Sequence, residues 1–259
     1  MKYASLLLAI TLIGPAQAAD PDFQKVANCM RASVPPILRA ENFQIDSTDK
    51  TGKTHSLDGK FFAQREKDRL RVMLHISGPA TVAGASYLVI EKKDSDEDDM
   101  YVFLPSVNRV RHITGGFANG SLLGTDFSYA EVKQISNAFS GSDGKLDGTE
   151  KIDGRDTSVI TFKPLAATKS PYSTVKSWVD QQSCLVLKAE FNVGSKVRKR
   201  LTVPADSIRQ VGKYWHVSRL EMQDLKLGTH TLMTLGGIDS SKEIPSSYFN
   251  PASFHVGQK

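Results

Sequence analysis

Short segments in which apolar and polar residues alternate fill most of this 259-residue chain, and they leave few folds open to it. A period of two is typical of β-strands whose two faces meet different surroundings. Turn residues separate the segments, and the pairs Asp153-Gly154 and Gly212-Lys213 each leave room for a two-residue hairpin loop. We therefore predict about eleven strands joined mostly by short turns, which gives an antiparallel meander rather than a parallel sheet. The last two predicted strands are 214–222 and 225–235.

The segment 100–132 predicts a strand, a turn at Pro105, a second strand, a glycine-rich loop and then a helix. Residues 101–104 are apolar on both faces, so we expect this strand to be covered on both sides. Ser128 and Glu131 have the spacing of a capping box that begins the helix. The loop and helix form either a plain cover for a sheet or a lid over an apolar cavity.

A second helix is predicted near the N-terminus. Asp20 stands at the capping position and Pro21 at the first helical position. Phe23 and Met30 follow helical spacing, and two prolines at 35–36 end the pattern. We expect this helix to pack against the concave side of the sheet.

The runs YVFLPSVNRVRHI and GTDFSY resemble the outer-membrane lipoprotein-sorting family, which has the fold of the lipoprotein carriers LolA and LolB. The resemblance covers roughly residues 40–253. It implies a mainly β (α+β) fold, in which a curved antiparallel sheet forms an incomplete barrel and helices close a hydrophobic cavity. Members of the family often act beside RND-type transporters, so the cargo need not be a lipoprotein.

If such a cavity exists, the apolar residues around the 100–132 segment are its best lining candidates. The predicted ligand-binding residues are Tyr101, Phe103, Phe117, Leu122, Leu123, Phe127 and Tyr129. The alternative is that they are ordinary core residues. The period alone does not say which strand face is the concave one, because a slip of one residue inverts every face.

The N-terminus has the pattern of a secretory signal peptide. Lys2 is followed by an apolar stretch at 6–13 and by the small-residue cleavage motif Ala16-Gln17-Ala18. We predict a signal peptide at 1–18, a single LolA-like domain at 19–259 and a periplasmic location. Since no cysteine stands at the cleavage site, we expect no lipid anchor.

The chain has two cysteines, Cys29 and Cys184. An even count in an exported protein favours a disulfide, and two buried thiols are the alternative. A bridge would connect the first helix to the end of a late strand.

Catalytic and metal-binding patterns are weak. The six histidines are scattered without a metal-binding spacing, and Ser121 lacks the Gly-x-Ser-x-Gly elbow of a hydrolase. The acidic run 94–99 lacks the glycine and glutamate positions of an EF-hand, so a solvated turn is the better interpretation. We expect no enzymatic activity, no metal and no cofactor. An exported chain without a nucleic-acid-binding motif also predicts no nucleic-acid partner.

The leading hypothesis is a soluble, monomeric periplasmic carrier. It would hold a lipid, a lipoprotein acyl chain or a lipid-like product for transfer toward the outer membrane. Its partners would be an RND-type inner-membrane transporter and an outer-membrane acceptor. The alternatives are a non-carrier accessory or sensor subunit of a transporter, and, with less support, a hydrolase of lipid-like esters that uses Ser121.

Overall fold

The computed structural model describes residues 20–66, 69–92, 98–113, 119–128, 131, 143–164 and 170–256. Helix α1 spans Pro21–Ser33, and short 3-10 turns lie at Pro105–Val107, Ala205–Ser207 and Ser246–Phe249. The strands are β1 Ile37–Thr48, β2 Thr54–Glu66, β3 Arg69–Gly78, β4 Ser86–Ile90, β5 Asp99–Leu104, β6 Arg109–Ile113, β7 Asp143–Ile152, β8 Arg155–Lys163, β9 Thr174–Asp180, β10 Val186–Val193, β11 Lys196–Thr202, β12 Ile208–Val211, β13 Tyr214–Val217, β14 Arg219–Asp224 and β15 Thr229–Asp239.

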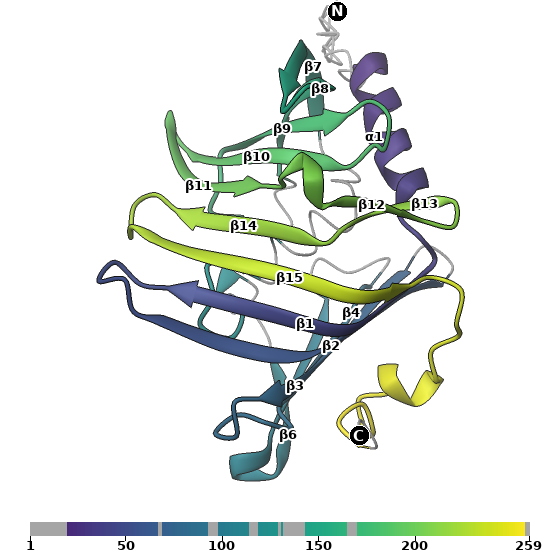
Figure 1. Ribbon diagram of the computed structural model, residues 1–259, viewed down its shortest axis with the longest axis vertical. Helices are drawn as coiled ribbons and strands as arrows, with labels where there is room; N and C mark the ends of the chain where they lie inside the picture. The colour runs from purple at the N-terminus through teal and green to yellow at the C-terminus, as the bar shows by residue number, and fades with distance from the viewer. Residues whose placement is uncertain are drawn as a thin grey trace, which may run out of the picture.

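Thirteen strands form one curved antiparallel sheet in the order β6-β5-β4-β3-β2-β1-β15-β14-β11-β10-β9-β8-β7. The pairing of β1 with β15 joins the strands of the first half to those of the second half. The sheet does not close, because its edge strands β6 and β7 lie at opposite ends of the molecule (Figure 1). The predicted mainly β architecture with an incomplete barrel is therefore confirmed.

The predicted number of about eleven strands is wrong, since the main sheet has 13 and β12 and β13 form a separate pair. The predicted strand 214–222 is divided at Ser218, whose backbone N–H and hydroxyl both donate to the carbonyl oxygen of Ser207. This contact turns the chain out of the β12–β13 hairpin and into β14.

The start of the predicted strand 225–235 is a turn instead. The Asp224 carboxylate accepts the backbone N–H groups of Lys226 and Leu227, and Gly228 has a φ of 69°. Helices are also few, since α1 is the one α-helix whose two ends both lie within the described residues. The predicted signal peptide and most of the helix after Ser128 lie outside those ranges.

The predicted turns are confirmed. Asp153 and Gly154 both have positive φ, at 48° and 79°, between the paired residues Ile152 and Arg155. This is the backbone conformation that a two-residue hairpin loop requires. A shift of register between β2 and β3 forms a bulge at Asp58 and Gly59.

Helix α1 is capped as predicted. One carboxylate oxygen of Asp20 accepts the N–H of Asp22 at 2.9 Å, and the other accepts the N–H of Leu146 on β7 at 3.0 Å. Phe23 is buried against Gly144, where a Cβ atom would lie 2.3 Å from the Phe23 ring. The Cys29–Cys184 disulfide connects the helix to the turn between β9 and β10 (Figure 1).

The two faces of the sheet are covered by different segments. We call the face that packs against α1 and residues 119–128 the inner face. Its apolar cluster contains Phe23, Ala27, Met30, Phe43, Ile45, Leu57, Leu74, Ile76, Ala85, Leu122, Phe127, Ile160, Phe162, Val175, Val179, Val186, Ala189, Phe191, Leu201 and Met222. On the outer face of the first-half strands, residues 244–254 pack on a second cluster that contains Phe62, Met73, Leu88, Ile244, Phe249 and Phe254.

Candidate ligand-binding site

Residues 119–128 form a compact segment on the inner face of the sheet. Leu122 donates its N–H to the carbonyl oxygen of Phe127 at 2.7 Å, and Thr125 donates to that of Leu122 at 2.9 Å. The turn between them uses positive φ at Leu123, 58°, and at Gly124, 78°. Leu122 and Phe127 are consequently both directed into the apolar cluster and are only 2% and 1% exposed, while Leu123 packs at its edge.

Asp126 connects this segment to β15. Its carboxylate accepts hydrogen bonds from the hydroxyls of Thr229 and Thr231, and its backbone N–H donates to the Thr231 hydroxyl at 2.9 Å. The Thr231 hydroxyl is also 3.1 Å from that of Ser47 on β1. Because Thr231 and Ser47 are both buried, these bonds satisfy polar groups that would be costly to leave unpaired.

Glu131 makes a second and more deeply buried connection. Its side chain is 1% exposed and lies 3.0 Å from the ammonium group of Lys199 on β11. The Tyr172 hydroxyl donates to the same carboxylate. Lys199 also donates to the carbonyl oxygen of Asp126 at 2.7 Å, so one ammonium group holds both ends of the segment 126–131.

The capping box predicted at Ser128 and Glu131 is confirmed. The Glu131 carboxylate accepts the N–H of Ser128 at 2.8 Å, and the Ser128 hydroxyl accepts the N–H of Glu131 at 3.2 Å. Burial, the negative charge of Glu131 and the hydrogen bond to it all raise the pKa of Tyr172, so this phenol keeps its proton. We call the connected side chains of Asp126, Glu131, Tyr172, Lys199 and Thr231 the polar clamp.

The structure places the predicted lining residues on two different faces. Leu122, Leu123 and Phe127 meet on the inner face. Tyr101 and Phe103 belong to the outer cluster under the C-terminal segment. Phe117 and Tyr129 lie outside the described residues.

On the outer face the rings of Tyr101 and Phe103 stack on histidines. Tyr101 stacks on His112 at a centroid distance of 4.8 Å, and Phe103 stacks on His255 at 4.1 Å. The expectation that strand 101–104 is covered on both faces is therefore confirmed, with the chain's own C-terminal segment as the cover on this side. Inner-face residues from distant strands, such as Phe43 and Phe191, were not predicted, because only the long-range pairing brings them together.

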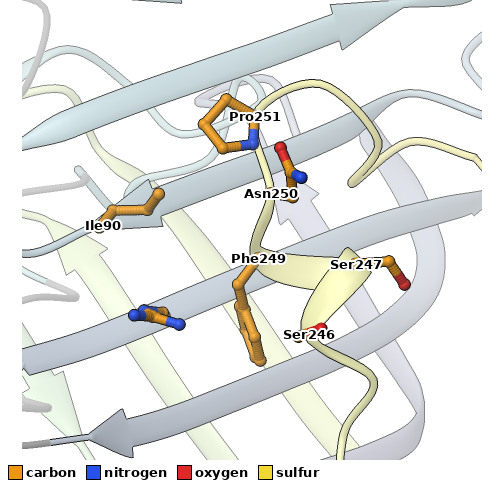
Figure 2. Close-up of a pocket in the computed structure, with 7 residues that line it drawn as sticks. Ile90, Ser246, Ser247, Phe249, Asn250 and Pro251 are labelled. Carbon is orange, nitrogen blue, oxygen red and sulfur yellow. The ribbon is translucent and has the colours of Figure 1, made fainter.

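A pocket of about 470 Å³ opens on the outer face, between the sheet and the C-terminal segment. Figure 2 shows Ile90 on a strand, with Phe249, Asn250 and Pro251 on the C-terminal segment. Arg71 also lines it and pairs with Glu66 at 3.1 Å. The pocket combines an apolar wall with one guanidinium group, but that group already has a carboxylate partner.

Side chains that could act as nucleophiles, bases or metal ligands are dispersed in the described part of the chain. The hydroxyl of Ser121 donates to the carbonyl oxygen of Thr125 at 2.6 Å. His75 lies 3.0 Å from the hydroxyl of Ser86, and burial together with the positive charge of Lys60 lowers the pKa of His75. The described residues contain no cluster of three or more His, Cys, Asp or Glu side chains that could hold a metal.

A family model described as "Uncharacterized protein" matches residues 68–255. No curated protein matches the chain at a significant level. No described helix has the length and apolarity needed to cross a membrane.

Solved structures share the fold. A DUF1329 family protein from Desulfovibrio piger is 22% identical, with a TM-score of 0.82 over 89% of this chain and 98% of its own. A domain described as an outer membrane lipoprotein-sorting protein domain, from Vibrio parahaemolyticus, is 18% identical, with a TM-score of 0.80 over 90% and 97%. A LolA superfamily protein from Nitrosomonas europaea is 19% identical, with a TM-score of 0.63 over 90% and 98%. At these identities the likeness establishes a LolA-like fold.

Proposed function

Since the chain belongs to the family whose model covers residues 68–255, and since its fold is LolA-like, we propose that it is a non-enzymatic carrier for a lipid or an acyl chain. The predicted signal peptide supports a periplasmic location for residues 19–259, which would act as one carrier domain. The family resemblance supports transfer toward the outer membrane beside an RND-type transporter. The cargo class is a lipid, a lipoprotein acyl chain or a lipid-like product.

The observation that carries this proposal is the arrangement of the segment 119–128 on the inner face. Its apolar side chains enter the inner cluster, while its attachment to the sheet runs through the polar clamp. Such a segment can move away from an apolar surface when a ligand takes its place, because side-chain bonds rather than strand pairing hold it. The short bridge between Ser121 and Ser128 lies within the segment itself.

The hydrophobic effect supplies the driving force for binding. A lipid tail in water exposes several hundred Å² of apolar surface, and burial is worth about 25 cal/mol per Å². Transfer into the inner cluster would therefore be favourable by on the order of 10 kcal/mol before the cost of moving the segment. No covalent step is needed, and release requires only that the segment return.

The alternative is a periplasmic accessory or sensor subunit with a filled core. The tight burial of Leu122 and Phe127, at 2% and 1%, together with Ile160 at 0%, favours this possibility. In that case the inner cluster would stabilise the fold without binding a free ligand. A measurement of bound lipid separates the two functions.

The first experiment is native mass spectrometry of the mature protein, purified from periplasm without detergent, followed by organic extraction. A stoichiometric apolar adduct is the expected result and would identify the cargo class. A clean apo mass, together with no uptake of a fluorescent fatty acid, would refute the carrier proposal and favour the accessory or sensor function.

Variants then localise the binding site. Replacing Leu123 and Phe127 with Asp should abolish uptake of the fluorescent fatty acid, and Leu123→Asp alone tests the half-buried position with less risk to the fold. The matched control is Leu225→Asp with Leu227→Asp, since these leucines are 44% and 56% exposed. Unchanged uptake in folded Leu123→Asp and double-variant proteins would contradict the proposed site. Ester hydrolysis that disappears on Ser121→Ala would instead support the hydrolase.

A further inference from the structure

A row of aligned residues crosses the inner face of the first-half strands. The register pairs Phe61 with Leu74, Leu74 with Tyr87, Tyr87 with Val102, and Val102 with Arg111. Residues directly opposite one another in antiparallel strands share a face, so all five side chains lie on one side. Phe61, Leu74 and Tyr87 belong to or pack against the inner cluster, which identifies that side as the inner face.

The row has the dimensions of an extended acyl chain. Neighbouring strands lie about 4.8 Å apart, so four steps from β2 to β6 span about 19 Å. The first four positions are apolar or aromatic. Leu74 and Val102 are 8% exposed, whereas Phe61 and Tyr87 are half-buried, so a ligand would take the place of the side chains that now cover the row. A long fatty acyl chain laid across these strands would match the row in both length and polarity.

The row ends in a cation at the edge of the sheet. Arg111 stands on β6, the last strand of the sheet, and Arg109 is paired with Leu104 on the same face two residues away. Both arginines are exposed. Residues two apart on a strand are separated by about 7 Å, so the two guanidinium groups can reach one anionic group together.

These arginines have no carboxylate partner among the described residues. The nearby Asp99 is engaged on the outer face, where it pairs with His112 at 3.0 Å and with Lys92 at 2.8 Å. Lys199, another cation on the inner face, differs from these arginines because it is already paired with Glu131. A planar guanidinium group binds carboxylate and phosphate through two parallel hydrogen bonds, which makes an anion the fitting occupant.

We propose that Arg109 and Arg111 bind the anionic headgroup of the cargo, whose acyl tail lies along the row from Phe61 to Val102. This inference rests on the proposed carrier function. It narrows the cargo to amphiphiles with a carboxylate or phosphate at the end of a long acyl chain. Neutral lipids of the same length would occupy the row without the headgroup contacts.

The test is competition against a bound fluorescent fatty acid on the delipidated protein. The competitors share a sixteen-carbon chain of the kind that the roughly 19 Å row fits: palmitate, hexadecyl phosphate, methyl palmitate and monopalmitoylglycerol. Wild-type protein should bind the two anionic competitors about tenfold more tightly than the neutral ones. The ratio of palmitate to hexadecyl phosphate distinguishes a fatty acid from a phospholipid-type headgroup.

The deciding variant is Arg109→Gln with Arg111→Gln. It should lose the anionic preference while its affinity for methyl palmitate stays unchanged. The matched control, Lys145→Gln with Lys151→Gln, removes the same charge from β7 at the opposite edge and should keep the preference. Equal wild-type affinity for charged and neutral competitors would overturn this inference while leaving the carrier function standing. Failure of every amphiphile to bind would overturn both.

Discussion

The ion pair between Lys199 and Glu131 should be the strongest attachment of the segment 119–131. Its side chains are 14% and 1% exposed, so Lys199→Met would leave a buried carboxylate without its cation. Breaking a buried pair in this way costs about 3 kcal/mol, at the lower end of the usual range because Lys199 retains some contact with water. With a slope of about 2 kcal/mol per molar urea, the unfolding midpoint should fall by about 1.5 M.

Equilibrium urea unfolding of four variants beside the wild type gives a sharp comparison. Glu131→Gln keeps the capping geometry and removes the charge, so the double variant with Lys199→Met should lose less than the sum of the two single variants. The control is Lys151→Met, which breaks the exposed pair with Asp156, in which the side chains are 68% and 64% exposed. We expect no measurable change in the urea midpoint of this control. If Lys199→Met is as mild as Lys151→Met, the polar clamp does not hold the segment and the reasoning fails.

Three further predictions concern stability. Cys29→Ala with Cys184→Ala removes a disulfide between residues 155 positions apart and should lower the free energy of unfolding by about 4 kcal/mol. A wild-type urea midpoint that does not change when a reductant is added would contradict this. Gly59→Ala would place a Cβ atom 2.1 Å from the carbonyl oxygen of His75 and 2.7 Å from the Phe43 ring, and should lower the free energy of unfolding by about 3 kcal/mol; a wild-type urea midpoint would refute the close packing at the bulge. Because the pKa of Tyr172 is raised from 10.0, the unfolded chain should ionise there first, so stability should fall as pH rises above 10, and Tyr172→Phe should remove that part of the loss.

The features that could be predicted from the sequence are the local ones. The hairpin at Asp153-Gly154, the cap at Asp20 and the capping box at Ser128 each depend on residues a few positions apart. The strand count failed at Ser218 for the opposite reason. Ser218 bonds to Ser207, which is eleven residues away, and the alternation of apolar and polar residues does not predict such a contact.

The candidate site was predicted only in part, because its faces and partners are long-range. Tyr101 and Phe103 alternate with Val102 in β5, and only the pairing with β4 decides that they face the C-terminal segment. Of the polar clamp, only Glu131 was predicted, as part of the capping box, and its partners were not. Lys199 lies 68 residues from Glu131 in sequence, and a lysine in an exposed-looking basic strand is ordinarily taken for a solvated residue.

The positions of the polar clamp and of the row from Phe61 to Arg111 lead to one more testable consequence. The clamp joins the segment 119–131 to β11 and β15, whereas the row runs over β2 to β6. These strands lie on different sides of β1 in the sheet order. The headgroup contacts at the β6 edge therefore do not involve the clamp, whether or not the segment 119–128 moves aside for the acyl tail. Lys199→Met should then leave the preference for anionic competitors intact, even though it destabilises the protein. Loss of that preference in the folded variant would show that the two features work as one site.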